Sequence, residues 1–143
     1  MSQIIRDITE ITRCGAQYRA DQLEPMDLKG CHASYLMEIC AHPGISQDTL
    51  AKRICINKSN VARQAVVLEE KGFVTRVPST TDKRIMELRP TQKTLDLLPQ
   101  ISGILKCWEV CITGDLTAEE KEQLATLLAK MKTRATHYMD ARP

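Results

Sequence analysis

The chain has 143 residues, of which 43% are hydrophobic and 27% are charged, and its formal net charge is +2. This length and composition predict one compact domain, with or without an oligomerisation arm, and exclude two independent cores. No apolar stretch reaches the roughly 18 residues of a membrane span, and the first residues lack the basic head and cleavage site of a signal peptide, so we expect a cytoplasmic protein.

Six cysteines would indicate a disulfide scaffold only in a secreted, loop-rich chain. Here each cysteine lies inside or beside a helical pattern, and we expect free thiols in a reducing compartment. The six are Cys14, Cys31, Cys40, Cys55, Cys107 and Cys111.

Charge is unevenly distributed along the chain. Residues 46–93 carry ten Lys or Arg against five Asp or Glu, whereas the remaining residues carry ten basic and thirteen acidic side chains. A basic middle between acidic flanks indicates a polyanion-binding segment held by a non-binding frame. Aromatic residues make up only 3% of the chain, which argues against a base-stacking surface for single strands.

The first predicted element is a helix over residues 2–22. Apolar or small residues recur at helical spacing and form a broad face that needs a partner. They are Ile4, Ile8, Ile11, Gly15 and Tyr18. A second helix is predicted over 28–41, and His42-Pro43-Gly44 ends it, because proline cannot continue the ladder and glycine tolerates a left-handed turn.

A short helix over 47–53 and a longer one from Asn57 to about Lys71 follow. Ser46 and Asn57 are suited to cap the first amides of these two helices, and Gly72 ends the longer one. The turn between them is Ile54-Cys55-Ile56.

The hydrophobic period then changes from helical to that of strands. Residues 73–77 and 84–88 are short and β-prone, and the polar stretch 78–83 between them contains Pro, Ser, Thr and Asp. This pair predicts a β-hairpin, which we call the wing.

Two helices complete the prediction. Thr91 is placed to cap a long helix, which Pro99 should bend or divide and Gly114 ends. Thr117 and Glu120 form a capping box that begins the last helix.

The segment around the third and fourth helices meets the packing demands of a helix-turn-helix, in which the first helix braces the second in the DNA major groove. Leu50 is apolar at the core, Ala51 is small where the helices nearly touch, and Ile54, Ile56 and Val61 flank the turn and seat the second helix. An ordinary helical hairpin without a ligand would meet the same demands.

Two positions depart from the usual helix-turn-helix pattern. Cys55 occupies a turn position often held by glycine, which predicts a slightly different turn. Gln64 occupies a position that is usually apolar, which places its side chain at the DNA edge.

With the wing added, the chain resembles the MarR family of winged-helix regulators over essentially its whole length. The residues that carry the resemblance are His42-Pro43-Gly44-Ile45-Ser46, Leu50-Ala51, Lys58-Ser59-Asn60-Val61-Ala62-Arg63, Leu68-Glu69-Glu70-Lys71-Gly72-Phe73-Val74, and the wing residues Asp82-Lys83-Arg84 followed by Leu88 and Thr91. The chain departs from the family at Pro90, where Leu is common, and at Thr94, where Gly is common; both positions lie at the junction of the wing and the long helix.

The resemblance implies a fold that is mainly α with a small β-hairpin (α+β). Residues 28–90 would form the winged helix-turn-helix, and residues 1–24 and 91–143 a helical dimerisation part. Two copies double the DNA contacts and present recognition helices to half-sites about one helical turn apart. The alternative is that the terminal helices pack within one chain.

The resemblance also implies which residues of the recognition helix contact double-stranded DNA. Ser59, Asn60, Arg63 and Gln64 would face base edges or phosphates in the major groove. Lys58 would contact phosphate and add salt-dependent affinity.

In the wing, Arg84 would enter the minor groove, where narrow A·T-rich segments concentrate negative potential. Asp82 would pair with Arg84 and hold the wing tip, and Lys83 and Arg76 would contact phosphate. For each basic residue the alternative is a solvated surface charge, and for Asp82 a simple turn-forming role.

Family members commonly respond to a small aromatic or anionic effector bound between the dimer arm and the winged helix. The candidate lining here comes from the first, second and long fifth helices, although each residue could equally be plain core. The candidates are Cys14, Tyr18, Cys31, His32, Tyr35 and Trp108.

Other functions leave weaker signals. Cys107 and Cys111 lie four apart on one helix face and would suit a thiol switch or, with Cys31 and His32, a zinc site, but no second ligand pair has a fixed relation to them. We therefore predict no metal and no cofactor, with redox sensing kept as an alternative. No nucleophile motif or phosphate loop indicates an enzyme; the remaining alternative is a protein-interaction module that kept the winged fold without DNA binding.

Overall fold

The computed structural model describes residues 2–143, which divide into two compact units, residues 2–106 and 107–143. The first unit begins with helix α1 (Gln3–Leu23), capped by Ser2, whose hydroxyl accepts a hydrogen bond from the Ile5 amide. A short 3₁₀ helix, η1 (Glu24–Met26), follows, and Asp27 ends it in the left-handed conformation with φ of 60°. Among the described residues, no helix is long and apolar enough to cross a membrane.

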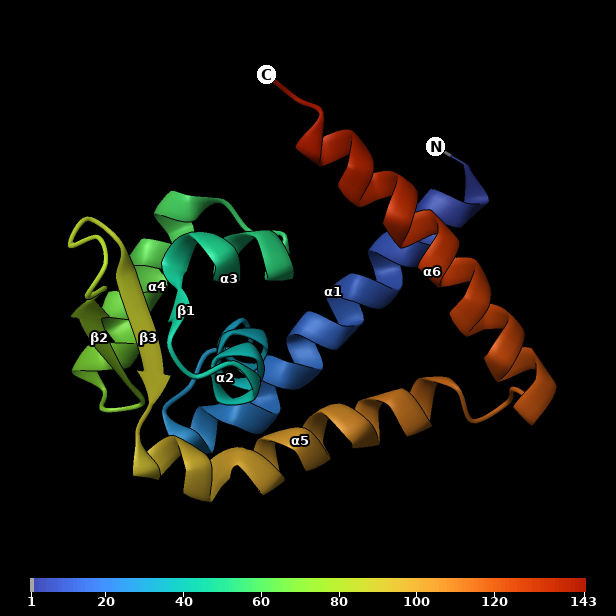
Figure 1. Ribbon diagram of the computed structural model, residues 1–143. Helices are drawn as coiled ribbons and strands as arrows, with labels where there is room; N and C mark the ends of the chain where they lie inside the picture. Colours follow the sequence, from blue (N-terminus) through green and yellow to red (C-terminus); the bar gives the residue numbers. More distant parts are fainter. Residues whose placement is uncertain (1) are drawn as a thin grey trace. The chain divides into compact units, whose positions relative to one another are not determined.

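Three helices form the centre of the first unit (Figure 1). They are α2 (His32–Ala41), α3 (Gln47–Ile54) and α4 (Lys58–Glu70). The second helix was predicted to begin at Leu28 and begins four residues later. Leu28 is buried, but it lies in the turn that follows Asp27 and not in the helix.

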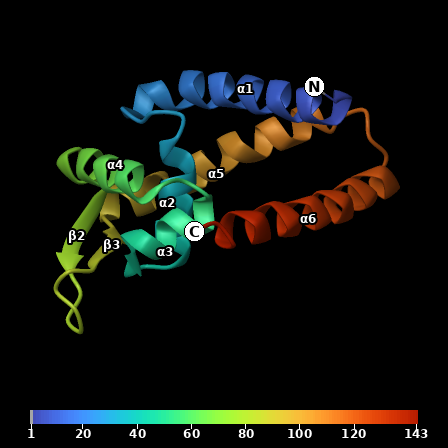
Figure 2. The same ribbon diagram turned by 90° about the horizontal axis from the view of Figure 1, so that it is seen from above.

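A three-stranded antiparallel sheet packs beside these helices, in the order β1-β3-β2. Strands β2 (Val74–Pro78) and β3 (Met86–Pro90) form the predicted wing, with Arg76 opposite Leu88. The loop that joins them extends away from α2, α3 and α4 (Figure 2).

Two features of the sheet differ from the prediction. Strand β3 begins at Met86, two residues later than expected, because the Asp82 carboxylate accepts the Arg84 amide and holds Arg84 in the loop. Strand β1 (Ile45–Ser46) was not predicted; its two residues pair with Leu88 and Glu87, more than forty residues later in the chain.

The core of the first unit is aliphatic, as the composition indicated. Helices α2 and α4 contribute its centre, and Phe73 is its only aromatic residue besides Tyr35 among those described. The fully or nearly buried hydrophobic residues are Leu23, Leu28, Ala33, Tyr35, Leu36, Ile39, Ile45, Leu50, Ala51, Val61, Ala65, Leu68, Phe73, Val74, Leu88 and Ile101.

Helix α5 (Gln92–Ile112) crosses the boundary between the two units, and α6 (Ala118–Asp140) forms most of the second. Pro99 lies inside α5 without dividing it. The Thr91 hydroxyl, predicted to cap α5, donates to the Gly72 carbonyl at 2.6 Å. The predicted capping box is confirmed: Thr117 accepts the Glu120 amide, and the Glu120 carboxylate accepts the Thr117 amide.

The central packing predicts the effect of removing a buried side chain. Leu36 in α2 is completely buried, so Leu36→Ala should lower the free energy of unfolding by about 2–5 kcal/mol, because it loses apolar burial and leaves a cavity. Urea denaturation at fixed protein concentration measures this change. Val66→Ala, at a position that is 37% exposed, is the matched control and should change stability by about 0.5 kcal/mol at most; equal losses in both variants would contradict this account of the core.

Candidate nucleic-acid interface

The candidate interface begins with the turn between α3 and α4. Ser46 caps α3 through its hydroxyl, which accepts the Thr49 amide at 3.0 Å. Asn57 caps α4 in the same way, accepting the Asn60 amide at 2.8 Å. Between them Cys55 has φ of 57°, the left-handed conformation that glycine adopts easily and other residues rarely do. The different turn predicted for Cys55 is therefore not observed: the chain keeps the conformation and places a cysteine in it.

Helix α4 has one buried face and one free face. Val61, Ala65 and Leu68 are completely buried in the core. The period of 3.6 residues puts positions 59 and 63 outside, and Ser59 and Arg63 are exposed; Lys58, the first residue of the helix, is exposed as well. These side chains are available to a ligand that approaches the N-terminal half of the helix.

Local contacts order this free face. Arg63 reaches the Asn60 side-chain oxygen at 3.4 Å, and the Ser59 hydroxyl donates to the Asn57 side chain at 2.9 Å. Lys58 lies 3.4 Å from Asp48 of α3, with both side chains about two-thirds exposed. Such exposed pairs cost little to separate, so they leave the cations free to contact phosphate.

Gln64 lies differently from its neighbours. Its side chain is half-buried, and its oxygen Oε1 lies 2.8 Å from Nε2 of His32 in α2. The polar residue at this usually apolar position thus has a buried polar partner. The contact directs the amide oxygen of Gln64 toward the protein, whereas the sequence placed the side chain at the DNA edge.

The tip of the wing is fixed by an ion pair. One carboxylate oxygen of Asp82 accepts from the backbone amide and Nε of Arg84, at 3.0 and 3.1 Å, and the other lies 3.0 Å from its terminal nitrogen. This bidentate pairing holds the pKa of Asp82 below its ordinary value, chiefly through the Arg84 side chain and next through its backbone amide. Arg84 itself is 90% exposed, so a fixed, solvent-facing guanidinium stands at the end of the hairpin.

The other two basic residues predicted for the wing lie in different surroundings. Lys83 is exposed beside Arg84. Arg76 is directed toward α4, with its Nε 3.8 Å from Glu69, and only 21% of its side chain is exposed. An Arg76 held in this way has less freedom to reach phosphate than Lys83.

The predicted effector residues have varied surroundings. Tyr18 donates to the Ile104 carbonyl at 2.9 Å, and Cys14 and Cys31 are exposed. His32 and Tyr35 are buried, with ring centroids 6.3 Å apart. Trp108 belongs to the second unit. A surface hollow along α6 is lined by other residues: Glu119, Glu122, Gln123, Thr126 and Leu127.

All six cysteines are free thiols. Cys40 is half-buried, and burial raises the pKa of its thiol; the other five are exposed. Within residues 2–143, no three His, Cys, Asp or Glu side chains are grouped so that they could hold a metal ion.

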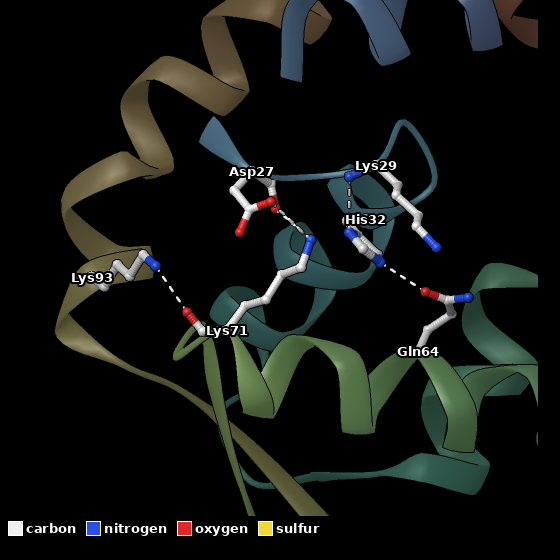
Figure 3. A network of polar contacts seen from close by, with 6 residues as sticks. All are labelled: Asp27, Lys29, His32, Gln64, Lys71 and Lys93. Atoms are coloured by element: carbon white, nitrogen blue, oxygen red, sulfur yellow. Dashed lines mark hydrogen bonds and ion pairs between the residues drawn. The ribbon is translucent and has the colours of Figure 1, made fainter. Parts of the chain in front are cut away.

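A polar network at the C-terminal end of α4 was missed by sequence reasoning (Figure 3). Lys71 donates to the backbone carbonyl and the carboxylate of Asp27, at 3.0 and 3.1 Å. Lys93 of α5 donates to the Lys71 carbonyl at 2.8 Å and lies 4.2 Å from the centre of the Phe73 ring. The partners are separated by as many as 44 positions, and no sequence periodicity links them.

A helix-turn-helix with a basic free face on its second helix, followed by a hairpin with an exposed arginine at its tip, defines a winged helix-turn-helix DNA-binding protein. Comparisons with known proteins agree. The sequence profile of the MarR family matches residues 32–86. The chain is 32% identical over 133 residues to YybA of Bacillus subtilis, an uncharacterised HTH-type transcriptional regulator, covering 92% of this chain and 88% of that protein.

Solved structures show the same fold. The transcriptional regulator SlyA superposes with a TM-score of 0.93 at 26% identity, covering 97% of this chain and 98% of that one. A MarR-family protein from Listeria monocytogenes, solved in complex with 26mer DNA, gives 0.90 at 26% identity, covering 96% and 91% of the two chains. The chain belongs to the MarR family of transcriptional regulators.

The ion pair at the wing tip predicts a measurable titration. The pKa of Asp82, followed by NMR, should lie below its ordinary value, and Arg84→Ala should raise it because the carboxylate loses its main partner. In the native state the group binds fewer protons than in the unfolded state, so its contribution to stability is present above the ordinary carboxyl pKa and is lost as the pH falls through the native value. Lys83→Ala is the matched control and should leave the Asp82 titration in place; an unchanged titration in Arg84→Ala would disprove the pairing.

Proposed function

We propose that this regulator acts in the cytoplasm as a homodimer that binds a pseudo-palindromic operator and represses the adjacent gene. The observation that carries the proposal is the pair of solvent-facing basic elements, the free face of α4 and the wing tip at Arg84. One such pair covers a single half-site, and two copies related by a twofold axis supply the contacts that operator selectivity requires. A dimer seated on a promoter would exclude the polymerase.

Exposed apolar side chains on the terminal helices support the dimer. In α1, Ile4, Ile5 and Ile11 are each more than half exposed. Helix α6 separately exposes Leu124, Leu127, Leu128, Met131, Tyr138 and Met139. Large apolar surfaces of this kind are typical of helices covered by a partner, and a second copy of the chain would bury them.

In the complex, Ser59, Asn60 and Arg63 would read base edges in the major groove, and Lys58 would contact phosphate. Arg84 would enter the flanking minor groove, positioned by Asp82, with Lys83 on the neighbouring backbone. Arg76 would give a weaker phosphate contact because Glu69 pairs with it. Gln64 would contact DNA only through its amide NH₂ group.

The test of the proposal is selection of duplexes from a random pool, together with sedimentation of the free protein and of its complex with the selected duplex. Two inverted half-sites about one helical turn apart and a dimeric species are the expected results. A monomer in both measurements, or a pool with no enriched sequence at low salt, would contradict it.

The two classes of contact on α4 predict different variant behaviour. Arg63→Ala should weaken binding to the selected duplex by about 1–3 kcal/mol per half-site. It should also relax the sequence preference at the bases that Arg63 reads. Lys58→Ala should weaken binding to the selected and the random duplex alike. It should also reduce the slope of log affinity against log salt concentration by about 1 for each phosphate that is no longer neutralised. Fluorescence anisotropy over a salt series measures both, with Arg142→Ala as the control. If both variants lost affinity equally on every duplex, α4 would not be the base-reading helix.

We also propose that a small aromatic or anionic effector modulates DNA affinity. The supporting observation is the Tyr35 hydroxyl, which is buried and has no hydrogen-bond partner within residues 2–143. An unpaired buried hydroxyl is costly, and a ligand with a polar group could satisfy it. Cys14, Tyr18, Cys31 and His32, which belong to the same unit as Tyr35, remain candidate neighbours of such a ligand.

Tyr35→Phe tests this second proposal because it removes only the unpaired hydroxyl. The variant should keep the stability and operator affinity of the wild type, since no hydrogen bond within the protein is lost. A phenolic or carboxylate compound that releases the wild type from the selected duplex should act more weakly on the variant. Equal release of both proteins would exclude Tyr35 from the effector site.

A further inference from the structure

The recognition helix α4 is tied at two points to one short segment, residues 27–32, which connects η1 to α2 (Figure 3). At the C-terminal end, Lys71 binds Asp27 through both its carbonyl and its carboxylate. In the middle of the helix, Gln64 binds His32. Both ties are polar contacts between groups that are distant in sequence, and the one at Gln64 is next to Arg63 on the DNA-reading face.

The segment is itself pressed against α1. A Cβ at Gly30 would lie 3.1 Å from the Ala20 backbone nitrogen and 3.2 Å from the Ala16 carbonyl oxygen. Contacts this tight leave the segment little room to shift unless α1 shifts with it. Residues 27–32 therefore form a connection of fixed position that packs against α1 and is hydrogen-bonded to α4 and to Lys71 at its end.

The hydrogen-bond pattern of His32 determines its protonation state. Its Nδ1 lies 3.0 Å from the Lys29 backbone nitrogen, which can only donate, so Nδ1 carries no proton. In the neutral ring the proton is then on Nε2, which donates to the Gln64 oxygen at 2.8 Å. The ring is completely buried, and both of its nitrogens are used.

A proton added to this ring has no acceptor. Protonation at Nδ1 would set one N–H against the Lys29 N–H and leave a charge in a buried site. The charged groups that act on the ring are Lys29, Lys71 and Asp27, and the Tyr35 ring packs against its edge. Burial is the main reason that the pKa of His32 lies below its ordinary value; the Gln64 hydrogen bond opposes it, the two lysines add to it, and Asp27 opposes it weakly.

We propose that His32 is a positioning residue for DNA reading: its hydrogen bond to Gln64 fixes the rotation of α4 about its axis, and protonation of the ring releases that helix. Protonation at Nδ1 removes the acceptor of the Lys29 amide and places a charge in the buried site, so the imidazolium would move toward solvent and in doing so give up its bond to Gln64. Rotation of α4 would then move Asn60 and Arg63 away from the base edges, while the basic surface would stay positive. This inference rests on the proposed role of α4 in reading the operator.

The predicted sign of the pH effect separates this device from simple charge attraction. A protonated histidine adds positive charge, which by itself strengthens binding to any duplex. Positioning predicts the opposite for the selected duplex: its affinity relative to a random duplex falls as the pH is lowered through the native pKa of His32, which lies below the ordinary imidazole value of about 6.5. Because the native pKa is lowered, the native state also loses stability as the pH falls from the ordinary value toward the native one.

Two conservative variants divide the functions of the ring. His32→Gln places an amide N–H near the position of Nε2, so it should keep the bridge to Gln64 without titrating. His32→Asn places an oxygen near Nδ1, so it should keep the Lys29 contact and lose the bridge. His42→Gln is the control, because His42 is an exposed histidine whose polar partners, Glu38 and Arg53, lie in α2 and α3.

The experiment is fluorescence anisotropy with the selected duplex and a random duplex from about pH 8, through the ordinary imidazole pKa of about 6.5, down to the lowest pH at which the protein stays folded. We expect the preference of the wild type and of His42→Gln for the selected duplex to fall roughly fivefold or more on acidification, the equivalent of one broken hydrogen bond. His32→Gln should keep the preference at all pH values. His32→Asn should show the reduced preference even at high pH, with unchanged affinity for the random duplex.

Each outcome decides between the two proposals. A wild type that prefers no duplex at high pH would remove the DNA-reading function itself. If the wild type prefers the selected duplex but keeps that preference on acidification, or if His32→Asn prefers it equally, or if His32→Gln keeps the pH response, the proposed role of His32 is wrong and DNA reading stands. Thermal unfolding at high pH, together with random-duplex affinity, checks that both variants are folded.

Discussion

The structure depends on the seating of one helix, α4. Its inner face, Val61, Ala65 and Leu68, is completely buried, while the outer face of the same helix must stay free for a ligand. The buried and the free residues differ only in their angular position around the helix axis. A rotation of the helix about this axis would therefore expose core residues and bury contact residues at the same time. The elements around α4 act against such a rotation: α3 packs against it, His32 of α2 is hydrogen-bonded to its Gln64, and β2 follows it directly through the turn at Gly72.

The wing and the recognition helix use different means to present a cation. On α4, Arg63 is supported by Asn60, a neighbour on the same turn. The wing tip has no helical turn that could provide such a neighbour. There the Asp82 carboxylate orders Arg84 by accepting hydrogen bonds from both its backbone amide and its guanidinium. In each case a short polar residue orders an exposed arginine, which lowers the conformational entropy lost when DNA binds.

Polar contacts, rather than apolar packing alone, set the position of α4 relative to the chain that precedes it. Apolar contacts are non-directional, whereas a hydrogen bond to a buried ring requires a narrow range of distance and angle. The bridge from His32 to Gln64 and the anchor from Lys71 to Asp27 thus give the free face of α4 a defined orientation. Lys93 extends the anchor to α5 through the Lys71 carbonyl, so the two ends of the winged region are joined at one point.

The sequence by itself determined the order of the helices, the caps at Ser46, Asn57 and Thr117, the hairpin, and the free cations of α4 and the wing, because local spacing and capping chemistry specify them. Tertiary structure alone decided the pairing of β1 with β3, the partner of Gln64, the direction of Arg76 toward Glu69, and the contact of Thr91 with Gly72. Each of these joins groups whose contact no local pattern encodes. A two-residue strand carries no periodic signal, and the surroundings of a side chain such as Gln64 exist only once distant segments have packed together.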